Sequence, residues 1–377
     1  MGLFGTDGVR GLANEELTAE LAYHLGKAGG VYWRARAETD TPVVLLGRDT
    51  RLSGDMLTAA VAAGLMAAGC AVRDLGVAPT PAVAYLTGTS RAVGGVVVSA
   101  SHNPWQYNGI KFFSAAGTKL QREEEAELEA LVDHSRAGKL PGAGPREIGR
   151  LVECHWELDR YTADLIGLVR KALGSRHPFS GLKVVIDCAH GATVATAQQV
   201  LAALGATVVS LGVEPDGLNI NAGCGSLHPE AVAARVRAEQ AQLGLAFDGD
   251  GDRVIAVTEE GSVVDGDGIM AVCARDLAER DQLAANTVVA TVMSNLALDL
   301  LLAQWDIAVA RTPVGDREVY NRMVELGAVL GGEPSGHIIF AAHNKTGDGL
   351  LTGLQLLMVL RRTGQPLSQL VADFQPL

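Results

Sequence analysis

The sequence contains little of what would place it outside the cell or in a membrane. Its 377 residues include five scattered cysteines and no CxxC pair, a pattern that indicates buried or idle thiols in a reducing compartment. The longest apolar stretch, residues 59–72, is too short to cross a bilayer. No charged-then-apolar leader opens the chain. We therefore expect a cytoplasmic protein without a membrane partner.

Basic residues are also in deficit, with 31 Lys and Arg against 43 Asp and Glu, a net charge of −12. This balance argues against a nucleic-acid surface or an anionic-membrane patch, so nucleic acid is not an expected partner. Any phosphorylated substrate must be bound by locally placed Arg and Lys. The 48% apolar content gives ample core, and the length indicates two to three domains.

One pattern of strand, polar loop, helix and strand recurs three times. In each copy the strand, the helix and the second strand are given in that order. The first copy is 43–49, 53–68 and 71–76. The second is 183–187, 193–204 and 206–212, and the third is 287–293, 296–304 and 307–312. Each copy predicts a βαβ-like layer. The wide and unequal spacing excludes a solenoid and favours three related α/β domains in series.

Composition suggests where these domains meet. A Gly- and Pro-rich segment, 137–145, follows an expected acidic helix, 123–132. We place domain 1 at 1–148, domain 2 at 149–257, domain 3 at 258–365, and the start of a linker at 366–377. A helix at 350–361 closes domain 3.

A serine loop follows the β-branched segment 96–98. It presents Ser101 beside His102, and Pro104 and an Asn-Gly pair break the chain before Lys111. A hydroxyl on a tight loop at a strand's end, with a cation returning to it, is what a phosphoryl-accepting serine needs. Taken singly, these residues also fit a capped turn, a structural histidine and a solvated lysine. The prediction therefore depends on a second segment.

That segment alternates aspartate and glycine between two expected strands. Asp248, Asp250 and Asp252 would lie on one side of a tight turn, where their repulsion is costly without a hard cation among them. Mg²⁺ suits such an oxygen cage and leaves a position for a phosphate oxygen. A solvated acidic turn is the simpler alternative. A calcium EF-hand is excluded, because Arg253 stands where its loop requires glycine and no helix flanks the segment.

Two further loops carry groups that suit a polar ligand. Glu333, Ser335 and His337 offer a carboxylate, a hydroxyl and an imidazole, the mixture that binds sugar hydroxyls. A plain hairpin turn is the alternative for this loop. The other loop ends a strand and begins a helix, where free N–H groups and Arg317 could meet an anion. Plain N-capping by Asp316 is the alternative there.

Four motifs in this order carry a resemblance to a known family. They are Phe-Gly-Thr-Asp-Gly-Val-Arg-Gly (4–11), Ser-Ala-Ser-His-Asn-Pro (99–104), Asp-Gly-Asp-Gly-Asp-Arg (248–253) and Gly-Glu-Pro-Ser-Gly-His (332–337). The chain resembles the α-D-phosphohexomutase superfamily over nearly its whole length. Within this superfamily, the branch that acts on glucosamine phosphates is favoured by three segments: Asn-Gly-Ile-Lys-Phe-Phe, Val-Gly-Asp-Arg and Thr-Gly-Asp-Gly. The resemblance implies three consecutive related α/β domains with mixed sheets.

The resemblance also implies a reaction, the interconversion of glucosamine 6-phosphate and glucosamine 1-phosphate for UDP-N-acetylglucosamine and cell-wall precursor synthesis. Ser101, as phosphoserine, would donate its phosphoryl group to the 1-hydroxyl, and the bisphosphate intermediate would return its other phosphoryl group. One Mg²⁺ per chain would bind the phosphoserine oxygen and the three aspartates. A hexose 1,6-bisphosphate would prime the serine. A homodimer is the assembly that the family suggests.

The same resemblance assigns roles to further residues. Arg10, Lys111 and Arg253 would stabilise charge on the transferring group, and His102 would assist beside the serine. Either Lys111 or His337 would be the general base and acid, and the sequence does not choose between them. The residues that would contact substrate are Arg253, Gly315, Asp316, Arg317, Glu333 and Ser335.

Two departures from the family pattern matter. Pro334 stands where the glucosamine branch usually has glutamine, which weakens the inferred sugar preference. The family's fourth domain, with its Arg-Pro-Ser-Gly-Thr-Glu-Pro-type loop for the non-transferring phosphate, has no counterpart in this sequence. Each charge-assisted hydrogen bond from that loop is worth about 1.5–3 kcal/mol. We therefore expect this chain to hold Mg²⁺ and phosphoserine. Losing several such bonds should lower its kcat/KM by about three orders of magnitude or more relative to a mutase with the fourth domain.

Two alternatives stay open. One is a phosphomannomutase or phosphoglucomutase of the same superfamily, which would differ in specificity alone. The other is a non-catalytic sugar-phosphate binder that has lost the fourth domain. The presence of Ser101, Lys111 and all three aspartates argues against the binder, because binding alone needs neither a phosphoserine nor a metal cage.

Overall fold

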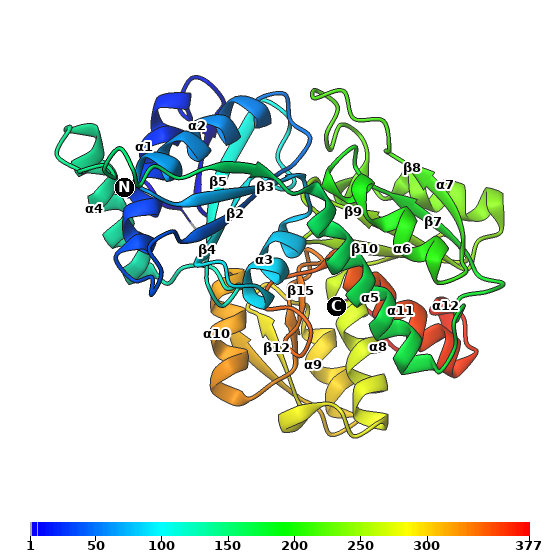
Figure 1. Ribbon diagram of the computed structural model, residues 1–377. Helices are drawn as coiled ribbons and strands as arrows, with labels where there is room; N and C mark the ends of the chain where they lie inside the picture. The colour runs from blue at the N-terminus through cyan, green and yellow to red at the C-terminus, as the bar shows by residue number, and fades with distance from the viewer. Residues whose placement is uncertain (1, 6) are drawn as a thin grey trace. The chain divides into compact units, whose positions relative to one another are not determined.

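The computed structural model describes residues 2–5 and 7–377, and contacts divide the chain into two compact units (Figure 1). Unit 1 runs to Tyr161 and includes Pro215–Ile220; unit 2 comprises Thr162–Glu214 and Asn221–Leu377. Thr6, which belongs to the first motif, lies outside the described residues. Across those described residues, every helix is too short or too polar to span a membrane.

Unit 1 is built on a six-stranded mixed sheet. Its strands, in spatial order, are β1 (Val9–Leu12), β5 (Tyr107–Ser114), β4 (Gly94–Val98), β2 (Val43–Arg48), β3 (Ala71–Val77) and β6 (Leu151–Glu153). β4, β2, β3 and β6 are parallel, whereas β5 and β1 add antiparallel at the β4 edge. The parallel strands β2 and β4 are almost wholly buried, as expected for strands covered on both faces.

Helices cover this sheet because their apolar residues recur at helical spacing. In α1 (Ala19–Arg34) the buried side chains include Leu21, Leu25, Ala28 and Tyr32, which share one face. Figure 1 shows α1 beside α2 (Gly54–Ala67), and both contribute to one core cluster of unit 1. The remaining helices of this part are α3 (Thr80–Thr89) and α4 (Arg122–Arg136), and α5 (Leu158–Leu173) leads into unit 2.

Unit 2 contains two mixed sheets. The first has the strand order β11 (Val263–Val264), β10 (Val254–Thr258), β9 (Leu243–Phe247), β7 (Lys183–Asp187) and β8 (Thr207–Leu211), with helices α6 (Ala197–Ala203) and α7 (Glu230–Glu239). β9, β7 and β8 are parallel, and β10 and β11 extend the β9 edge antiparallel. Its buried cluster joins Val185 and Ala246 on the sheet to Val232 and Val236 on α7.

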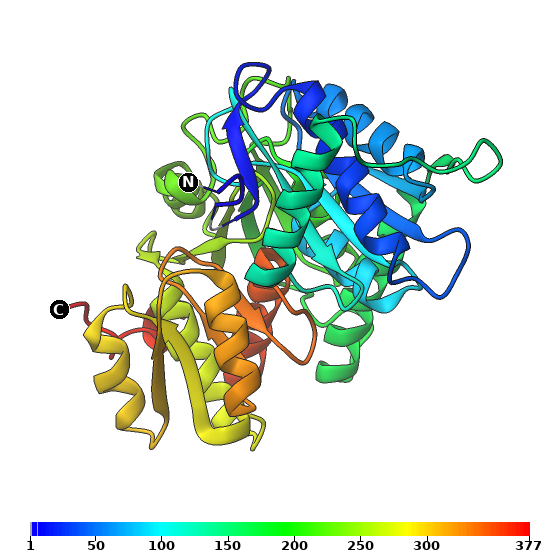
Figure 2. The same ribbon diagram turned by 90° about the vertical axis from the view of Figure 1, so that its left-hand side faces the viewer.

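The second sheet of unit 2 has four strands, β13 (Ala308–Thr312), β12 (Thr287–Thr291), β14 (Leu330–Gly332) and β15 (Ile338–Phe340). Its helices are α8 (Gly266–Glu279), α9 (Leu296–Ala303), α10 (Asp316–Leu326), α11 (Gly349–Thr363) and the short α12 (Leu367–Leu370). α10 lies along this sheet (Figure 2), where Val319 and Met323 pack on Val289 and Ile339.

The three predicted βαβ units are confirmed. β2 and β3, β7 and β8, and β12 and β13 pair in parallel across their intervening helices. The helix expected at 193–204 is wrong as one continuous element. It divides into a 3₁₀ turn, Ala192–Ala195, and α6, because Thr196 has non-helical angles (φ −133°, ψ −42°). The hydroxyls of Thr193 and Thr196 donate to backbone carbonyls there, which competes with regular helix.

Three predicted functional loops occupy equivalent places in the three sheets. The serine loop joins β4 to β5, the aspartate loop joins β9 to β10, and the Glu333 loop joins β14 to β15. Each loop leaves the carboxyl end of a parallel strand and returns along an antiparallel neighbour. The carboxyl ends of parallel strands are the usual ligand-binding edge of α/β sheets.

The five cysteines, Cys70, Cys154, Cys188, Cys224 and Cys273, are all free. All but Cys224 are buried, and burial raises the pKa of the Cys70 and Cys188 thiols to about 12. Thiols with such raised pKa values stay protonated at neutral pH. The five cysteines thus form no disulfide, and four of them are buried, as the expectation of buried or idle thiols requires.

Candidate active site

The serine loop holds Ser101 in an unusual backbone conformation. Ser101 is buried and has φ +53°, in the left-handed region that a residue with a side chain rarely adopts. Its N–H donates to the Ser99 hydroxyl at 2.9 Å, and its own Oγ lies 3.4 Å from Nδ1 of His102. A non-glycine residue keeps such a conformation only when its surroundings fix it.

A buried ion pair provides that support. Arg51 and Asp49 follow β2, both side chains are fully buried, and Arg51 Nε lies 2.8 Å from Asp49 Oδ2. The Arg51 guanidinium donates to the Ser101 carbonyl at 2.8 Å and to the Tyr107 carbonyl at 3.0 Å. Ser99, whose hydroxyl supports the Ser101 N–H, in turn donates to Asp49 at 2.6 Å. The two ends of the serine loop are thus joined through one guanidinium.

Asp7 is the centre of a cluster of cations in unit 1. Its carboxylate forms ion pairs with Arg10 and Lys119, and lies 3.0 Å from Nζ of the buried Lys111. Burial alone raises the pKa of Asp7, but Lys111, Lys119 and Arg10 together hold it well below its usual range. Lys111 is therefore an ion-paired ammonium, which suits a residue that stabilises negative charge.

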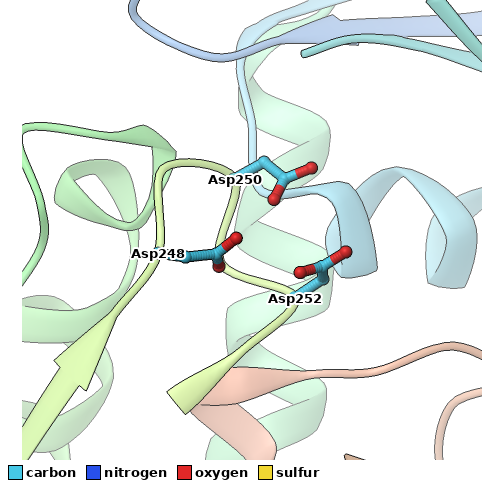
Figure 3. Close-up of side chains that lie close together, drawn as sticks. All are labelled: Asp248, Asp250 and Asp252. Carbon is cyan, nitrogen blue, oxygen red and sulfur yellow. The ribbon is translucent and has the colours of Figure 1, made fainter. Parts of the chain in front are cut away.

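In unit 2, the aspartate loop brings its three carboxylates together (Figure 3). Asp248 and Asp250 are fully buried and Asp252 is 4% exposed, and one oxygen of each lies within 4.8 Å of the others. Three buried carboxylates at this separation repel one another strongly unless a cation lies among them. All three donors are hard oxygen atoms, so the cluster fits Mg²⁺.

Backbone contacts from three directions hold the aspartate loop in place. The Arg253 N–H donates to Asp248 Oδ1 at 3.1 Å, and the Ala192 N–H donates to the Gly249 carbonyl at 2.8 Å. The Gly349 N–H, at the start of α11, donates to the Gly251 carbonyl at 3.0 Å. The loop is thus fixed by the segments after β7 and before α11, which positions the carboxylates before any cation arrives.

Arg253 follows the three aspartates directly. Burial alone lowers the pKa of its guanidinium, but the carboxylates of Asp252 and Asp248 raise it overall. Its Nε lies 3.8 Å from Asp252 Oδ1. Arg253 therefore places a permanent positive charge beside the carboxylate cluster.

The Glu333 loop is the hairpin between β14 and β15. It is hydrogen-bonded to the loop that contains Gly315, between β13 and α10. Glu333 Oε1 accepts from the Gly315 N–H at 3.0 Å, and Oε2 accepts from the Ser335 hydroxyl at 3.2 Å. The hairpin turn, which was the alternative prediction for this loop, is thus present. Its carboxylate and hydroxyl nevertheless lie beside the N-terminus of α10, in one polar group.

His337 lies at the junction of these elements. Its Nε2 accepts from the Gly347 N–H at 3.2 Å and lies 3.8 Å from Asp316 Oδ2. Because Nε2 is the acceptor, a neutral ring carries its proton on Nδ1. Gly315 occupies the cap position of α10, and Asp316, the first residue of the helix, accepts from the Arg317 N–H at 2.8 Å through Oδ1. The cap residue is therefore Gly315, one position before the Asp316 of the N-capping alternative.

The structure gathers the predicted site residues into two groups. Unit 1 holds Arg10, Ser101, His102 and Lys111, and unit 2 holds Asp248, Asp250, Asp252, Arg253, Gly315, Asp316, Arg317, Glu333, Ser335 and His337. Sequence reasoning missed Asp7, Asp49, Arg51 and Lys119. One signal for Asp49 and Arg51 was available, since charged residues directly follow an apolar strand in Gly-Arg-Asp-Thr-Arg.

Comparison with known proteins defines the class. The chain matches the family models for phosphoglucomutase/phosphomannomutase alpha/beta/alpha domain I over residues 1–139, domain II over 159–261 and domain III over 265–377. It therefore belongs to the phosphoglucomutase/phosphomannomutase family, the α-D-phosphohexomutase superfamily, as the four motifs indicate.

Two relatives of the chain are named phosphoglucosamine mutases. The chain is 53% identical over 376 residues to the phosphoglucosamine mutase of Desulforudis audaxviator, covering 100% of this chain and 81% of that protein. It is 50% identical over 375 residues to the phosphoglucosamine mutase of Geobacillus kaustophilus, covering 99% and 81%. The chain thus spans about four fifths of the length of these relatives.

Solved structures share the fold. A phosphoglucomutase/phosphomannomutase family protein from Burkholderia thailandensis matches with a TM-score of 0.83 and 29% identity, over 98% of this chain and 79% of that one. The N-acetylphosphoglucosamine mutase of Aspergillus fumigatus, solved with GlcNAc-6P and magnesium, matches with a TM-score of 0.62 at 15% identity, over 99% and 80%. At that identity the second likeness concerns the fold alone.

Proposed function

We propose that this chain is a phosphoglucosamine mutase, which interconverts glucosamine 6-phosphate and glucosamine 1-phosphate through a phosphoserine. The observation that carries the proposal is the buried cluster of Asp248, Asp250 and Asp252, whose ligand oxygens lie within 4.8 Å of one another. About 50% identity to phosphoglucosamine mutases over the whole chain supports the choice of substrate.

Ser101 is the phosphoryl carrier in this proposal. Phosphoserine 101 transfers its phosphoryl group to the 1-hydroxyl of glucosamine 6-phosphate, so the serine O–P bond breaks and a bond to O1 forms. The resulting 1,6-bisphosphate returns its 6-phosphoryl group to Ser101 and leaves glucosamine 1-phosphate. The fixed backbone of Ser101 supports this role, because in-line transfer needs the oxygen in one place.

The charged groups have separate tasks. Mg²⁺, held by the three aspartates, would neutralise charge on the transferring phosphoryl group. In unit 1, Arg10 and Lys111 form ion pairs with Asp7 and supply two cations. In unit 2, the Arg253 guanidinium lies beside Asp252 of the aspartate loop. These three cations would stabilise the equatorial oxygens in the transition state.

The two candidate general bases, Lys111 and His337, differ in the contacts that their side-chain nitrogen atoms make. Lys111 is paired with Asp7, which favours its charged form, and His337 Nε2 already accepts from Gly347. We assign Lys111 to charge stabilisation. We assign His337 to the proton transfer, which requires its Nε2 to exchange the Gly347 N–H for the proton of a substrate hydroxyl.

Sugar recognition falls to the Glu333 loop. The Glu333 carboxylate and Ser335 hydroxyl are joined, and Glu333 also orders Gly315 at the start of α10. Gly315, Asp316 and Arg317 would contact a phosphate or hydroxyl of the substrate at that helix end. Pro334 is the one residue of the loop that departs from the glucosamine branch, so sugar preference needs a direct test.

Phosphorus NMR tests the proposal. The purified chain is given Mg²⁺, glucose 1,6-bisphosphate as primer and glucosamine 6-phosphate, and the 1-phosphate is followed with time. Glucose 6-phosphate and mannose 6-phosphate run in parallel, with Ser101→Ala as the control. Preferential conversion of the glucosamine substrate, even slowly, supports the proposal. Preference for glucose or mannose phosphate assigns the chain to another mutase, and conversion that persists in Ser101→Ala contradicts the mechanism.

A further inference from the structure

Unit 2 contains a hollow that shares no residue with the candidate active site. Its volume is about 520 Å³, within the range of small-molecule sites. Its lining comes from the end of α5, the end of α8, the residue before β14, the end of β15 with the turn that follows it, and the second half of α11.

The lining is apolar on one side. Phe340 and Met358 are buried against the hollow, and Leu168 and Leu277 extend this surface from α5 and α8. An aromatic ring and a methionine side chain are adaptable partners for a flat apolar ligand.

Gln355 is an unexpected residue on this surface. It stands between Leu354 and Leu356 in α11 and is only 6% exposed. Within the described chain its side-chain amide makes no hydrogen bond to the protein, although the residue lines the hollow. The amide atoms are not enclosed by protein, so they face the hollow, where their donor and acceptor are available to a ligand.

The rim of the hollow is positively charged. Arg280 and Arg362 share the carboxylate of Asp276, each with an N–O distance of 2.7 Å, and Lys171 has no ion-pair partner among the described residues. Three cations against one carboxylate leave an excess of positive charge, in a chain whose net charge is −12. Desolvation lowers the pKa of His343, which also lines the hollow, and so favours the neutral ring, which can donate or accept a hydrogen bond.

We propose that this hollow binds a small organic anion. The ligand carries a flat apolar body against Phe340 and Met358, and a carboxylate or phosphate at the rim near Lys171 and Arg362. A hydrogen-bonding group of the ligand meets the amide of Gln355. The proposal does not depend on the proposed function, since none of these residues takes part in it.

Three matched probes test the proposal by fluorescence titration of the full chain: 2-naphthoate, 2-naphthyl phosphate and the neutral 2-naphthamide. We expect at least one anion to bind about tenfold more tightly than the amide, which corresponds to one charge-assisted contact. The comparison of the two anions shows whether carboxylate or phosphate is preferred. Equal binding of all three probes, or no binding at about 1 mM, overturns the proposal.

Variants locate the bound probe. Lys171→Gln is expected to weaken anion binding about tenfold and leave the amide unchanged. Gln355→Leu is expected to weaken binding of 6-hydroxy-2-naphthoate, whose hydroxyl can reach the amide, and to leave 2-naphthoate binding unchanged. Ala342→Trp, at an exposed lining position, is expected to block the hollow without disturbing the core.

Arg361→Gln is the matched control, because Arg361 precedes Arg362 in α11 but does not line this hollow. Its probe affinities are expected to equal those of the parent chain. If Arg361→Gln weakens binding as much as Lys171→Gln, or if Ala342→Trp leaves binding intact, the probes bind elsewhere and the proposal is wrong.

Discussion

The buried guanidinium of Arg51 donates a 2.8 Å hydrogen bond to the backbone carbonyl of Ser101, the residue proposed to carry the phosphoryl group. Arg51 is itself held by Asp49. The left-handed conformation of Ser101 therefore depends on a charged pair that contributes no atom to the proposed reaction. In this account, Arg51 is a positioning residue.

Replacing Arg51 with lysine keeps the charge beside Asp49 but loses the planar fork that reaches Ser101 and Tyr107. We expect Arg51→Lys to reduce the free energy of unfolding by about 3 kcal/mol, since at least one charge-assisted hydrogen bond is lost from a buried site. Phosphorylation of Ser101 should slow as well. Urea denaturation and a phosphorylation time course measure the two effects.

Arg48→Lys is the control for this prediction, because Arg48 lies on the same strand and pairs with Asp55 at 2.6 Å near the surface. Its cost should stay below about 1 kcal/mol. If the two variants lose equal free energy of unfolding, and Ser101 is phosphorylated at the parent rate in both, Arg51 does not position Ser101.

The Asp7 cluster predicts a pH-dependent contribution to stability. The folded-state pKa of Asp7 lies well below its usual value, so the ionised carboxylate stabilises the fold above about pH 4. This contribution is lost as the pH falls through the lowered folded-state value. Asp7→Asn should cost about 3 kcal/mol at pH 7, because three cations lose their counter-charge. The difference from the parent chain should shrink below about pH 4.

Denaturation of both proteins between about pH 3 and pH 7 measures this difference. Asp55→Asn, which removes the largely exposed partner of Arg48, is the control and should show a small difference throughout. A gap between Asp7→Asn and the parent chain that is constant with pH, or that widens in acid, is incompatible with a lowered pKa at Asp7.

Gly347 is predicted to be essential to the packing around the aspartate loop. A Cβ added there would lie 2.5 Å from the His337 ring and 2.6 Å from the Asp252 carbonyl oxygen. Gly347→Ala should therefore destabilise the chain by about 1–3 kcal/mol and weaken Mg²⁺ binding. Thermal denaturation and Mg²⁺ titration measure both effects.

Gly167→Ala is the opposite case. Gly167 lies inside α5, and a Cβ there would meet nothing within 4 Å. This variant should gain about 0.5–1 kcal/mol from the better helix propensity of alanine and bind Mg²⁺ unchanged. A gain in stability for Gly347→Ala would refute the tight contact.

The aspartate cluster predicts opposite effects of one substitution with and without metal. Asp250→Asn removes one of three repelling carboxylates, so it should raise the midpoint of thermal denaturation in EDTA. Mg²⁺ at about 100 times its Kd should stabilise the parent chain by about 2.7 kcal/mol, and most of this should vanish in the variant.

Asp373→Asn, which removes an exposed carboxylate outside the cluster, should change neither midpoint appreciably. If Asp250→Asn is less stable than the parent chain in EDTA and still gains from Mg²⁺, the three carboxylates do not form the metal site.

Local patterns were sufficient for the three βαβ units and for the aspartate loop. Alternating Asp and Gly between two apolar strands fixes where Asp248, Asp250 and Asp252 point, because only neighbouring residues are involved. The β2–α2–β3 unit likewise follows from an apolar strand, a helical segment and a second apolar strand in close succession.

Contacts between distant residues could not be predicted in this way. Arg51 and Ser101 are 50 positions apart, and Asp7 meets Lys111 only because β1 pairs with β5. The sequence also left the role of His337 open, since the atom that its ring uses depends on where the Gly347 N–H lies. These relationships are set by the sheet pairings, which no single segment specifies.

Phosphoryl transfer to Ser101 is the most direct test of the central claim. The metal-free chain is mixed with glucose 1,6-bisphosphate, with and without Mg²⁺, and the modified residue is identified by peptide mass spectrometry. The account predicts one phosphoryl group, on Ser101, that forms rapidly only with Mg²⁺ and slowly in Asp250→Asn. Labelling of another residue, or labelling of Ser101 at the same rate without Mg²⁺, would contradict it.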